Sequence, residues 1–120
     1  MTKPILCLDF DGVIHSYTSG WQGADKADDL IVPGALEFLD EVVKVFRVAI
    51  FSTRSTQPGG IHAMRELLLR NGVAGETFCS LEWPTAKPAA FLTLDDRALT
   101  FDGTWPSIET LRSFKPWNKR

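Results

Sequence analysis

The sequence predicts an α/β fold: a doubly wound, Rossmann-like parallel sheet in three α/β/α layers. Two observations support this prediction. Short, continuous apolar runs alternate with segments whose apolar residues recur at helical spacing, and polar clusters stand at the ends of the apolar runs. The 120 residues, 44% of them hydrophobic and 23% charged, are enough for one core and too few for two. We therefore expect a single domain over residues 1–120.

The first half of the chain contains two predicted strands. Ile5–Leu8 is a continuous apolar run of the kind that is buried in a parallel sheet. A long loop or small hairpin flap is expected over about residues 13–33, because this stretch is rich in Gly, Ser, Asp and Thr. Pro33-Gly34 then opens a helix with an apolar face formed by Leu36, Leu39, Val43 and Phe46. Arg47–Phe51 is the second strand.

The second half continues the alternation. A helix is predicted over about residues 61–70, where apolar residues again recur at helical spacing. Phe78–Leu81 is a weaker third strand, and Phe91–Leu94 is a fourth. Pro106–Ser113 is a short final helix, and the tail that follows, with its Lys, Arg and Trp residues, is expected on the surface.

The charge and the cysteines exclude several classes of protein. The net charge of −2 supplies no basic field of the kind that holds non-specific nucleic-acid binders on DNA. Cys7 and Cys79 lie in apolar stretches without metal-ligand spacing, so both are expected to be buried small side chains. The opening apolar run stops at Asp9. Its length of about five residues is too short for a signal peptide or a membrane span. We expect a cytoplasmic protein with no membrane partner.

Two carboxylates directly follow the first predicted strand. In Asp9-Phe10-Asp11-Gly12 they stand two residues apart, where the strand breaks into a turn. Desolvating a carboxylate is costly without a cation or hydrogen-bond donors, so this pair indicates a metal, phosphate chemistry or both. Ser52-Thr53 follows the second strand, and Asp95-Asp96 follows the fourth. Ligands of such sheets bind beyond the carboxyl ends of the strands, where all three clusters are expected.

The acidic residues predict a magnesium site. If the first and fourth strands are neighbours, Asp9 and Asp95 converge, and close carboxylates cannot all stay ionised without a compensating cation. A ligand set of oxygens alone selects a hard cation. Mg²⁺ is favoured, because it binds through one or two carboxylates plus a substrate phosphate. Bound Mg²⁺ also offsets the repulsion between an attacking carboxylate and a phosphate dianion.

Four short motifs resemble those of the haloacid dehalogenase superfamily of phosphotransferases. Leu8–Ile14 (LDFDGVI) is similar to the first motif, the apolar strand and serine of Val48–Ser52 to the second, and Leu94-Asp95-Asp96 to the fourth. Lys87 is the best candidate for the third. The match spans about residues 5–103, and the first motif is the most specific of the four in its strand context. The resemblance implies a fold of the haloacid dehalogenase type and a phosphatase activity.

The resemblance also implies roles for the acidic residues. Asp9 would be the nucleophile and form an aspartyl-phosphate, which divides one difficult displacement into two easier ones. Asp11 would act as general acid and base and would bind Mg²⁺ through its backbone carbonyl. Asp95 and Asp96 would complete the metal site together with Asp9. Because neighbouring side chains on a strand point in opposite directions, we expect only one of Asp95 and Asp96 to touch the metal directly.

The resemblance assigns the phosphate contacts to residues after the second strand. Ser52 would hold the transferring phosphoryl oxygens, with Thr53 as the neighbouring alternative and Arg54 as a further phosphate ligand. A helix cap is the other role open to Ser52 and Thr53. Lys87 would offset charge at the nucleophile, but in a fully extended strand it would stand roughly 26 Å from the fourth motif. Arg54 and Arg97 are the substitute cations.

The leading functional prediction is a Mg²⁺-dependent phosphatase that acts on a small phosphate monoester. The flap is too short for a separate cap domain, so the site should be open. Open sites in this superfamily tend to serve bulky substrates or to be covered by a partner subunit, which makes a homo-oligomer one expectation. A nucleic-acid end is one alternative substrate, although the acidic balance argues against a nucleic acid, and a phosphorylated sugar or nucleotide is another.

Two other classes of protein remain as alternatives. A signalling receiver also gathers aspartates at strand ends, but nothing acidic follows the second strand here. A non-catalytic module that binds Mg²⁺ or phosphate would keep the same scaffold. Trp21, Trp83 and Trp105 could stack on a base or a sugar, although aromatic side chains more often close a core or a flap. His15 is expected on a solvated loop, and Asp102 is a weaker candidate for the metal site.

Overall fold

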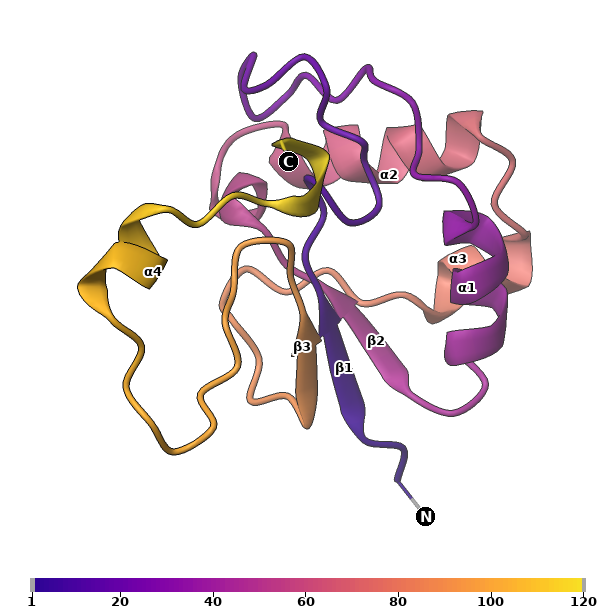
Figure 1. Ribbon diagram of the computed structural model, residues 1–120. Coiled ribbons are helices and arrows are strands. Elements are labelled where there is room, and N and C mark those ends of the chain that lie inside the picture. Colours follow the sequence, from indigo (N-terminus) through magenta and orange to yellow (C-terminus); the bar gives the residue numbers. More distant parts are fainter. Residues whose placement is uncertain (1, 120) are drawn as a thin grey trace.

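Residues 2–119 are described by a computed structural model, in which a three-strand parallel sheet forms the centre of the fold (Figure 1). The strands are β1 (Ile5–Leu8), β2 (Arg47–Ile50) and β3 (Leu92–Leu94), in the order β2-β1-β3. β1 pairs in parallel with both neighbours, so the carboxyl ends of all three strands lie at one edge of the sheet. The predicted α/β fold with a parallel sheet is confirmed at this level.

The helices lie between and after the strands. They are α1 (Ala35–Val42), the 3-10 helix η1 (Thr53–Thr56), α2 (Gly60–Arg70), α3 (Gly75–Ser80), α4 (Ile108–Arg112) and the 3-10 helix η2 (Trp117–Lys119). The helices predicted to begin near residues 34, 61 and 106 correspond to α1, α2 and α4. Within residues 2–119, no helix has the length and apolar character needed to cross a membrane.

One face of the sheet carries the core. The cross-strand partners Leu6–Val48 and Leu8–Ile50 are buried on this face, because side chains at alternate positions of a strand point the same way. Each such side chain contributes roughly 1.5–3 kcal/mol when fully buried. Both α1 and α2 pack into the same cluster, through Leu39 and Val42 of α1 and through Met64, Leu67 and Leu68 of α2. This packing fixes the strand ends that carry the polar clusters.

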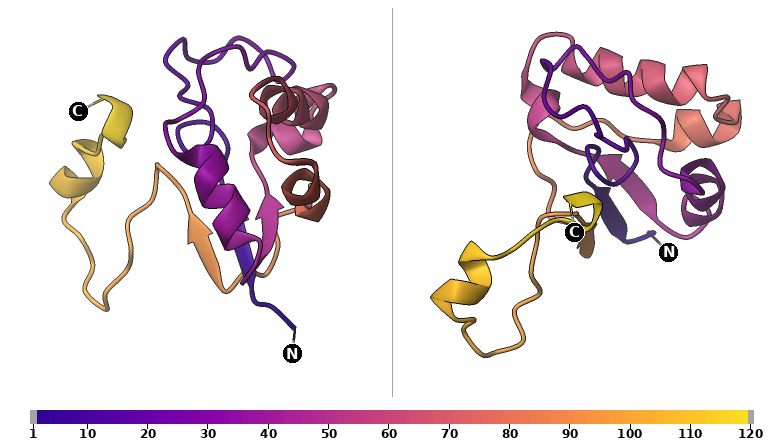
Figure 2. Two further views of the ribbon diagram at one scale, coloured as in Figure 1. Left: turned by 90° about the vertical axis from the view of Figure 1, so that its right-hand side faces the viewer. Right: turned by 45° about the horizontal axis from the view of Figure 1, so that its top comes forward.

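Within residues 2–119, no helix covers the opposite face of the sheet, which differs from the three-layer prediction. Cys7 and Ala49 are buried there, and Ala49 forms an isolated bridge with Glu82. Lys87 lies in the irregular segment before β3, and its positive charge acts to lower the pKa of the Cys7 thiol. α4 has no buried residue and stands away from the sheet in both views of Figure 2. Among the residues described, small side chains and an irregular segment thus replace the second layer of helices.

The prediction of a third strand at Phe78–Leu81 is wrong. Residues Gly75–Ser80 form α3, and Leu81 is the C-terminal cap of this helix. Phe78 and Leu81 are three residues apart and both pack on the core, a spacing that suits a helix face as well as a short strand. The buried Thr77 fixes α3 to α1 by donating a hydrogen bond from its hydroxyl to Asp40 (2.6 Å).

The two cysteines lie in different environments. Cys7 in β1 is buried as predicted, and burial raises the pKa of its thiol, against the charge of Lys87, which acts to lower it. Cys79 is exposed, contrary to the prediction. It lies two residues after the buried Thr77 on α3, and positions two apart on a helix face different sides.

The C-terminal region projects from the domain as an arm, residues 97–115, and then returns to it (Figures 1 and 2). Large apolar side chains of the arm are exposed, Trp105 by 83%. The radius of gyration of 15.0 Å accordingly exceeds the roughly 13.6 Å of a compact domain of this length.

The tail after the arm is fixed to the turn that follows β1. The indole N–H of Trp117 donates to the Gly12 carbonyl (2.7 Å), and the side-chain amide of Asn118 donates to the Ser16 carbonyl (3.1 Å). Pro116 between the arm and these contacts is buried. The tail lies largely on the surface as expected, with Trp117 51% exposed, but two of its polar side chains donate to backbone acceptors more than a hundred residues earlier.

Candidate metal and phosphate site

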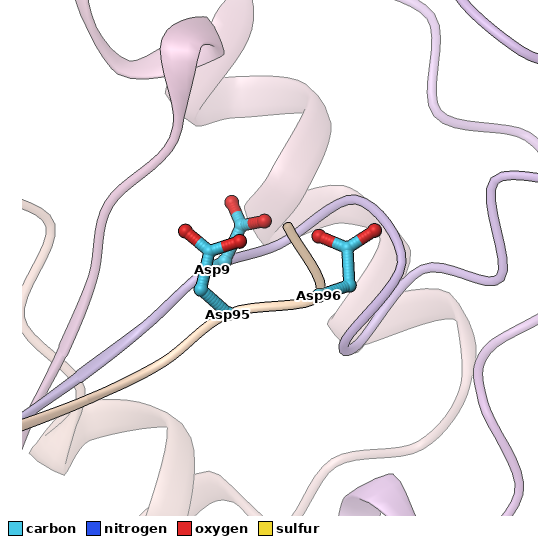
Figure 3. Close-up of side chains that lie close together, drawn as sticks. All are labelled: Asp9, Asp95 and Asp96. Atoms are coloured by element: carbon cyan, nitrogen blue, oxygen red, sulfur yellow. The ribbon is translucent and has the colours of Figure 1, made fainter. Parts of the chain in front are cut away.

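Three carboxylates from two strand ends meet at one point. Asp9 directly follows β1, and Asp95 and Asp96 directly follow β3. Because β1 and β3 are parallel neighbours, their carboxyl ends lie together, and the Asp9 N–H continues the ladder by donating to the Leu94 carbonyl (3.0 Å). One carboxylate oxygen of each aspartate lies within 4.8 Å of the other two (Figure 3). The structure thus brings Asp9 together with both members of the second acidic pair.

Asp95 and Asp96 do not alternate in direction as expected. β3 ends at Leu94, so both aspartates lie in the turn after the strand, where strand alternation does not apply. Asp95 accepts the backbone N–H of Arg97 (2.8 Å), which fixes this turn. Figure 3 shows the carboxylates of Asp9, Asp95 and Asp96 pointing to the same side of the chain.

Asp9 lies in an environment that disfavours its negative charge. Burial, a hydrogen bond with Asp96 and the charge of Asp95 raise the pKa of Asp9 from 3.8 to about 8, while a hydrogen bond with the Phe10 backbone acts to lower it. Without a cation, burial and the neighbouring carboxylates therefore favour the protonated form of Asp9. A divalent cation among the three carboxylates would relieve this repulsion, and the all-oxygen donor set fits a hard cation such as Mg²⁺.

The raised pKa of Asp9 makes stability and metal binding depend on pH in opposite directions. The pKa of Asp9 in the folded, metal-free protein, about 8, lies above the ordinary value of 3.8, so protonation of Asp9 favours folding. This stabilisation is complete below the ordinary pKa and is lost as the pH rises through the folded pKa. Mg²⁺ must displace the proton, so the affinity for Mg²⁺ should increase as the pH rises toward 8.

We expect the melting temperature of the metal-free protein to fall more steeply between about pH 5 and about pH 9 than that of an Asp9→Asn variant, which has no proton to lose. Mg²⁺ should raise the wild-type melting temperature more at the higher pH. Differential scanning fluorimetry with EDTA and with Mg²⁺ measures both effects. Parallel pH profiles for the two proteins would contradict the expectation.

The carboxylates line a cavity of about 300 Å³ that also receives residues from the flap and from the end of β2. Its lining consists of Asp9, Asp11, Tyr17, Trp21, Ser52, Thr53, Asp95, Asp96 and Arg97. The polar clusters that follow all three strands therefore share one cavity, at the edge where ligands bind in parallel α/β sheets. Tyr17 is the lining residue that sequence reasoning missed. The sequence feature that could have indicated Tyr17 is its position in the predicted flap, close to the first acidic pair.

Ser52 both caps a helix and lines the cavity. Its Oγ accepts the backbone N–H of Arg54 (2.9 Å), and its own backbone N–H donates to Oγ of Ser55 (3.1 Å), which forms a capping box at the start of η1. The two roles left open for Ser52 are therefore compatible. The cap uses a lone pair of the hydroxyl oxygen, so the hydroxyl hydrogen can still donate to a phosphoryl oxygen.

Asp11 is held by two buried partners. His15 donates from Nδ1 to Asp11 (2.9 Å), since its Nε2 accepts the backbone N–H of Asp29 (3.1 Å), so His15 is not the solvated loop residue expected. Arg54 donates to Asp11 from Nε (2.9 Å) and Nη2 (3.1 Å). Burial acts to raise the pKa of Asp11, but hydrogen bonds from His15 and Arg54 outweigh it and lower the pKa. Asp11 is therefore better suited to accept a proton than to donate one.

Arg54 does not face the cavity, although it was expected to bind phosphate. Its side chain is wholly buried, and Nη1 donates to the carbonyls of Gly23 (3.0 Å), Ala24 (2.8 Å) and Lys26 (2.9 Å). These three carbonyls belong to the flap, so Arg54 ties the flap to Asp11 and to η1. Its partners stand 28 to 43 residues away in the sequence, which is why no local pattern indicated this role.

Of the three cations considered for the phosphate, Arg97 is the one within the described residues that lines the cavity. Lys87 is exposed and is not among the residues that line the cavity. Its positive charge acts to lower the pKa of the Cys7 thiol in β1. Because β3 is only three residues long, the segment from Lys87 is not one extended strand, and the separation of roughly 26 Å does not apply. Asp102 lies in the arm, where it lines a separate hollow.

A glycine supports the second acidic pair. Gly12 has a left-handed φ of 81°, and a Cβ at this position would overlap the Asp96 carboxylate. Gly72, after α2, has nearly the same φ of 82° but open space around the place of a Cβ. Both Gly→Ala substitutions therefore carry the same backbone strain, of about 1–2 kcal/mol, and only one of them displaces a carboxylate.

We expect Gly12→Ala to weaken Mg²⁺ binding at least about tenfold relative to Gly72→Ala, because displaced supporting groups typically reduce metal affinity by that factor. Isothermal titration calorimetry of both variants measures the dissociation constants. Equal constants would show that Asp96 does not contribute to the site.

No family model, curated protein or solved structure matches this chain. The resemblance to the haloacid dehalogenase superfamily therefore stays a prediction from short motifs. The chemistry of the cavity has to support any statement of function.

Proposed function

We propose that this protein is a Mg²⁺-dependent phosphatase of the haloacid dehalogenase type, which hydrolyses phosphate monoesters through an aspartyl-phosphate on Asp9. The observation that carries the proposal is the convergence of Asp9, Asp95 and Asp96 within 4.8 Å in a cavity that Ser52 also lines. Exposed acidic residues alone are common on proteins. Here one of them is partly buried with a raised pKa, and a hydroxyl donor lines the same cavity.

Asp9, Asp95 and Asp96 would hold Mg²⁺ through carboxylate oxygens, with Asp11 contributing its backbone carbonyl. When bound, the ion supplies the positive charge that allows a carboxylate to approach a phosphate dianion. All the other catalytic roles fall to side chains of the cavity.

In the first step, a carboxylate oxygen of Asp9 attacks phosphorus, and the bond from phosphorus to the ester oxygen breaks. The leaving oxygen takes the electron pair of that bond and a proton from water, since the hydrogen bonds of Asp11 disfavour a proton there. The Ser52 hydroxyl donates to a phosphoryl oxygen, and Arg97 offsets negative charge at the rim. Positioning and charge stabilisation supply most of the catalysis in phosphoryl transfer.

In the second step, water attacks phosphorus, and the bond between phosphorus and Asp9 breaks. The ionised carboxylate of Asp11 accepts the proton of the attacking water and passes it to the hydroxide that the first step left, so Asp11 is ionised again. The products are inorganic phosphate and the regenerated Asp9 carboxylate. The partners of Asp11, His15 and Arg54, keep it ionised for this role.

Release of nitrophenolate from 4-nitrophenyl phosphate, with Mg²⁺ and with EDTA, tests the proposed function. Turnover that needs the metal supports a phosphatase. If the protein binds Mg²⁺ by calorimetry but hydrolyses no member of a panel of phosphate esters, it is instead a binding module that keeps the same scaffold. Failure to bind Mg²⁺ at all would remove the basis for both functions.

A further inference from the structure

Two aromatic side chains of the flap share the cavity with the carboxylates. Tyr17 and Trp21 both line it, and the Trp21 side chain is 48% exposed. The guanidinium carbon of Arg54 lies 5.0 Å from the centroid of the Trp21 ring, which places a buried cation against the indole. Trp21 thus lines the cavity and is about half exposed, while the Arg54 guanidinium packs against its ring.

The flap that carries these rings is held in place. Arg54 donates to three flap carbonyls, at Gly23, Ala24 and Lys26, directly after Trp21 in the chain. His15 links the start of the flap to Asp11 through one ring nitrogen and accepts the Asp29 N–H through the other. Trp21 therefore belongs to a segment anchored on both sides, and a ligand that contacts it meets a preorganised surface.

The backbone at Tyr17 is strained. Its φ of 61° is the one positive value at a non-glycine residue among residues 2–119, and a bulky side chain there costs about 1–3 kcal/mol. The surrounding contacts maintain this conformation: the Tyr17 ring packs edge-on against His15 at 6.0 Å, and the Tyr17 carbonyl accepts the Gly20 N–H (3.2 Å). Strain of this kind gathers at ligand-binding segments, and here it keeps Tyr17 among the residues that line the cavity.

We propose that the substrate is a phosphate monoester whose organic part carries a planar aromatic ring, and that this ring stacks on Trp21 while the phosphate lies at Asp9 and Ser52. The proposal rests on the proposed phosphatase function and narrows its substrate class. An aromatic ring can stack on the open indole surface, whereas glycerol has no planar face to offer it. The ring could be a nucleobase or an aryl group, since both offer the same planar face.

Substrate ratios test this proposal. The value of kcat/KM is measured for phenyl phosphate, adenosine 5′-monophosphate and glycerol phosphate with wild type, Trp21→Leu and Trp105→Leu. Because each ratio of a ring substrate to glycerol phosphate is compared between proteins, differences in leaving-group reactivity cancel. Trp105 is exposed on the arm, outside the cavity, so Trp105→Leu is the matched control.

We expect Trp21→Leu to lower at least one ring-to-glycerol ratio by between about fivefold and a hundredfold, mainly through KM, as loss of one stacked ring predicts. Trp105→Leu should keep the wild-type ratios. The ring substrate whose ratio falls more identifies a nucleoside or an aryl group as the source of the ring. Unchanged ratios in Trp21→Leu would overturn the proposal even when the protein is an active phosphatase.

A binding measurement separates failure of this proposal from failure of the proposed function. If wild type hydrolyses none of the three esters, the phosphatase function fails, and calorimetry with wild-type protein and Mg²⁺ still tests the stacking. Tighter binding of adenosine 5′-monophosphate or phenyl phosphate than of glycerol phosphate, lost in Trp21→Leu, supports the ring subsite. Equal affinities for all three ligands would refute it.

Discussion

Replacing Asp9 with Asn is expected to reduce turnover of phosphate esters by at least about a thousandfold, because the amide cannot attack phosphorus as a carboxylate does. The same substitution removes a carboxyl group whose pKa is raised to about 8, so the metal-free variant should be more stable than wild type above that pH. Loss of activity together with a gain in stability would distinguish a catalytic residue from a structural one.

Steady-state kinetics with 4-nitrophenyl phosphate and thermal melts in EDTA measure the two effects. Asp102→Asn is the matched control, since Asp102 is an exposed aspartate of the arm that lies outside the cavity. An Asp9→Asn protein that retains more than a tenth of the wild-type rate would rule out the aspartyl-phosphate.

Replacing Arg54 with Met is expected to lower the free energy of unfolding by about 3–5 kcal/mol, because it removes the buried cation that pairs with Asp11 and the hydrogen bonds that Arg54 donates to three flap carbonyls. The side chain of Met fills part of the same volume, so the loss reports the polar contacts more than a cavity. The flap should also become mobile, which hydrogen exchange at the backbone amides of residues 23–26 would show.

Urea unfolding compares Arg54→Met with Arg47→Met, in which another arginine loses a carboxylate partner. Arg47 pairs with Glu82 in a two-point contact (3.0 and 2.9 Å), but both side chains are nearly half exposed and screened by solvent, so we expect a much smaller change in the free energy of unfolding. Similar losses in the two variants would mean that the buried network does not hold the flap.

The parts of the fold that follow from local patterns could be predicted from the sequence. Ile5–Leu8 and Arg47–Ile50 are apolar runs of strand length, and the helical spacing from Leu36 onward matches α1. The segment around Phe78 is short enough for its apolar residues to fit either a strand or a helix, and the tertiary contacts that accompany the helix, such as that of Thr77 with Asp40, leave no local pattern.

The meeting of the carboxylates was predictable for a different reason. Parallel neighbouring strands bring their carboxyl ends together, so aspartates at Asp9 and Asp95 converge whatever the loops between them do. The positions of the cations depend on loops instead. Arg54 turns inward because flap carbonyls surround it, and Arg97 reaches the cavity because the chain turns directly after Asp96, and neither fact is encoded in local spacing.

The different exposure of the two cysteines allows one of them to be labelled selectively. The chain has two thiols, and Cys7 is buried with a raised pKa, while Cys79 is exposed. A maleimide fluorophore should therefore modify Cys79 and leave Cys7 intact. Because α3 contributes no residue to the cavity, the dye would lie outside the candidate site. The protein would then carry one fluorophore at a known position, with no substitution, for measurements of ligand binding.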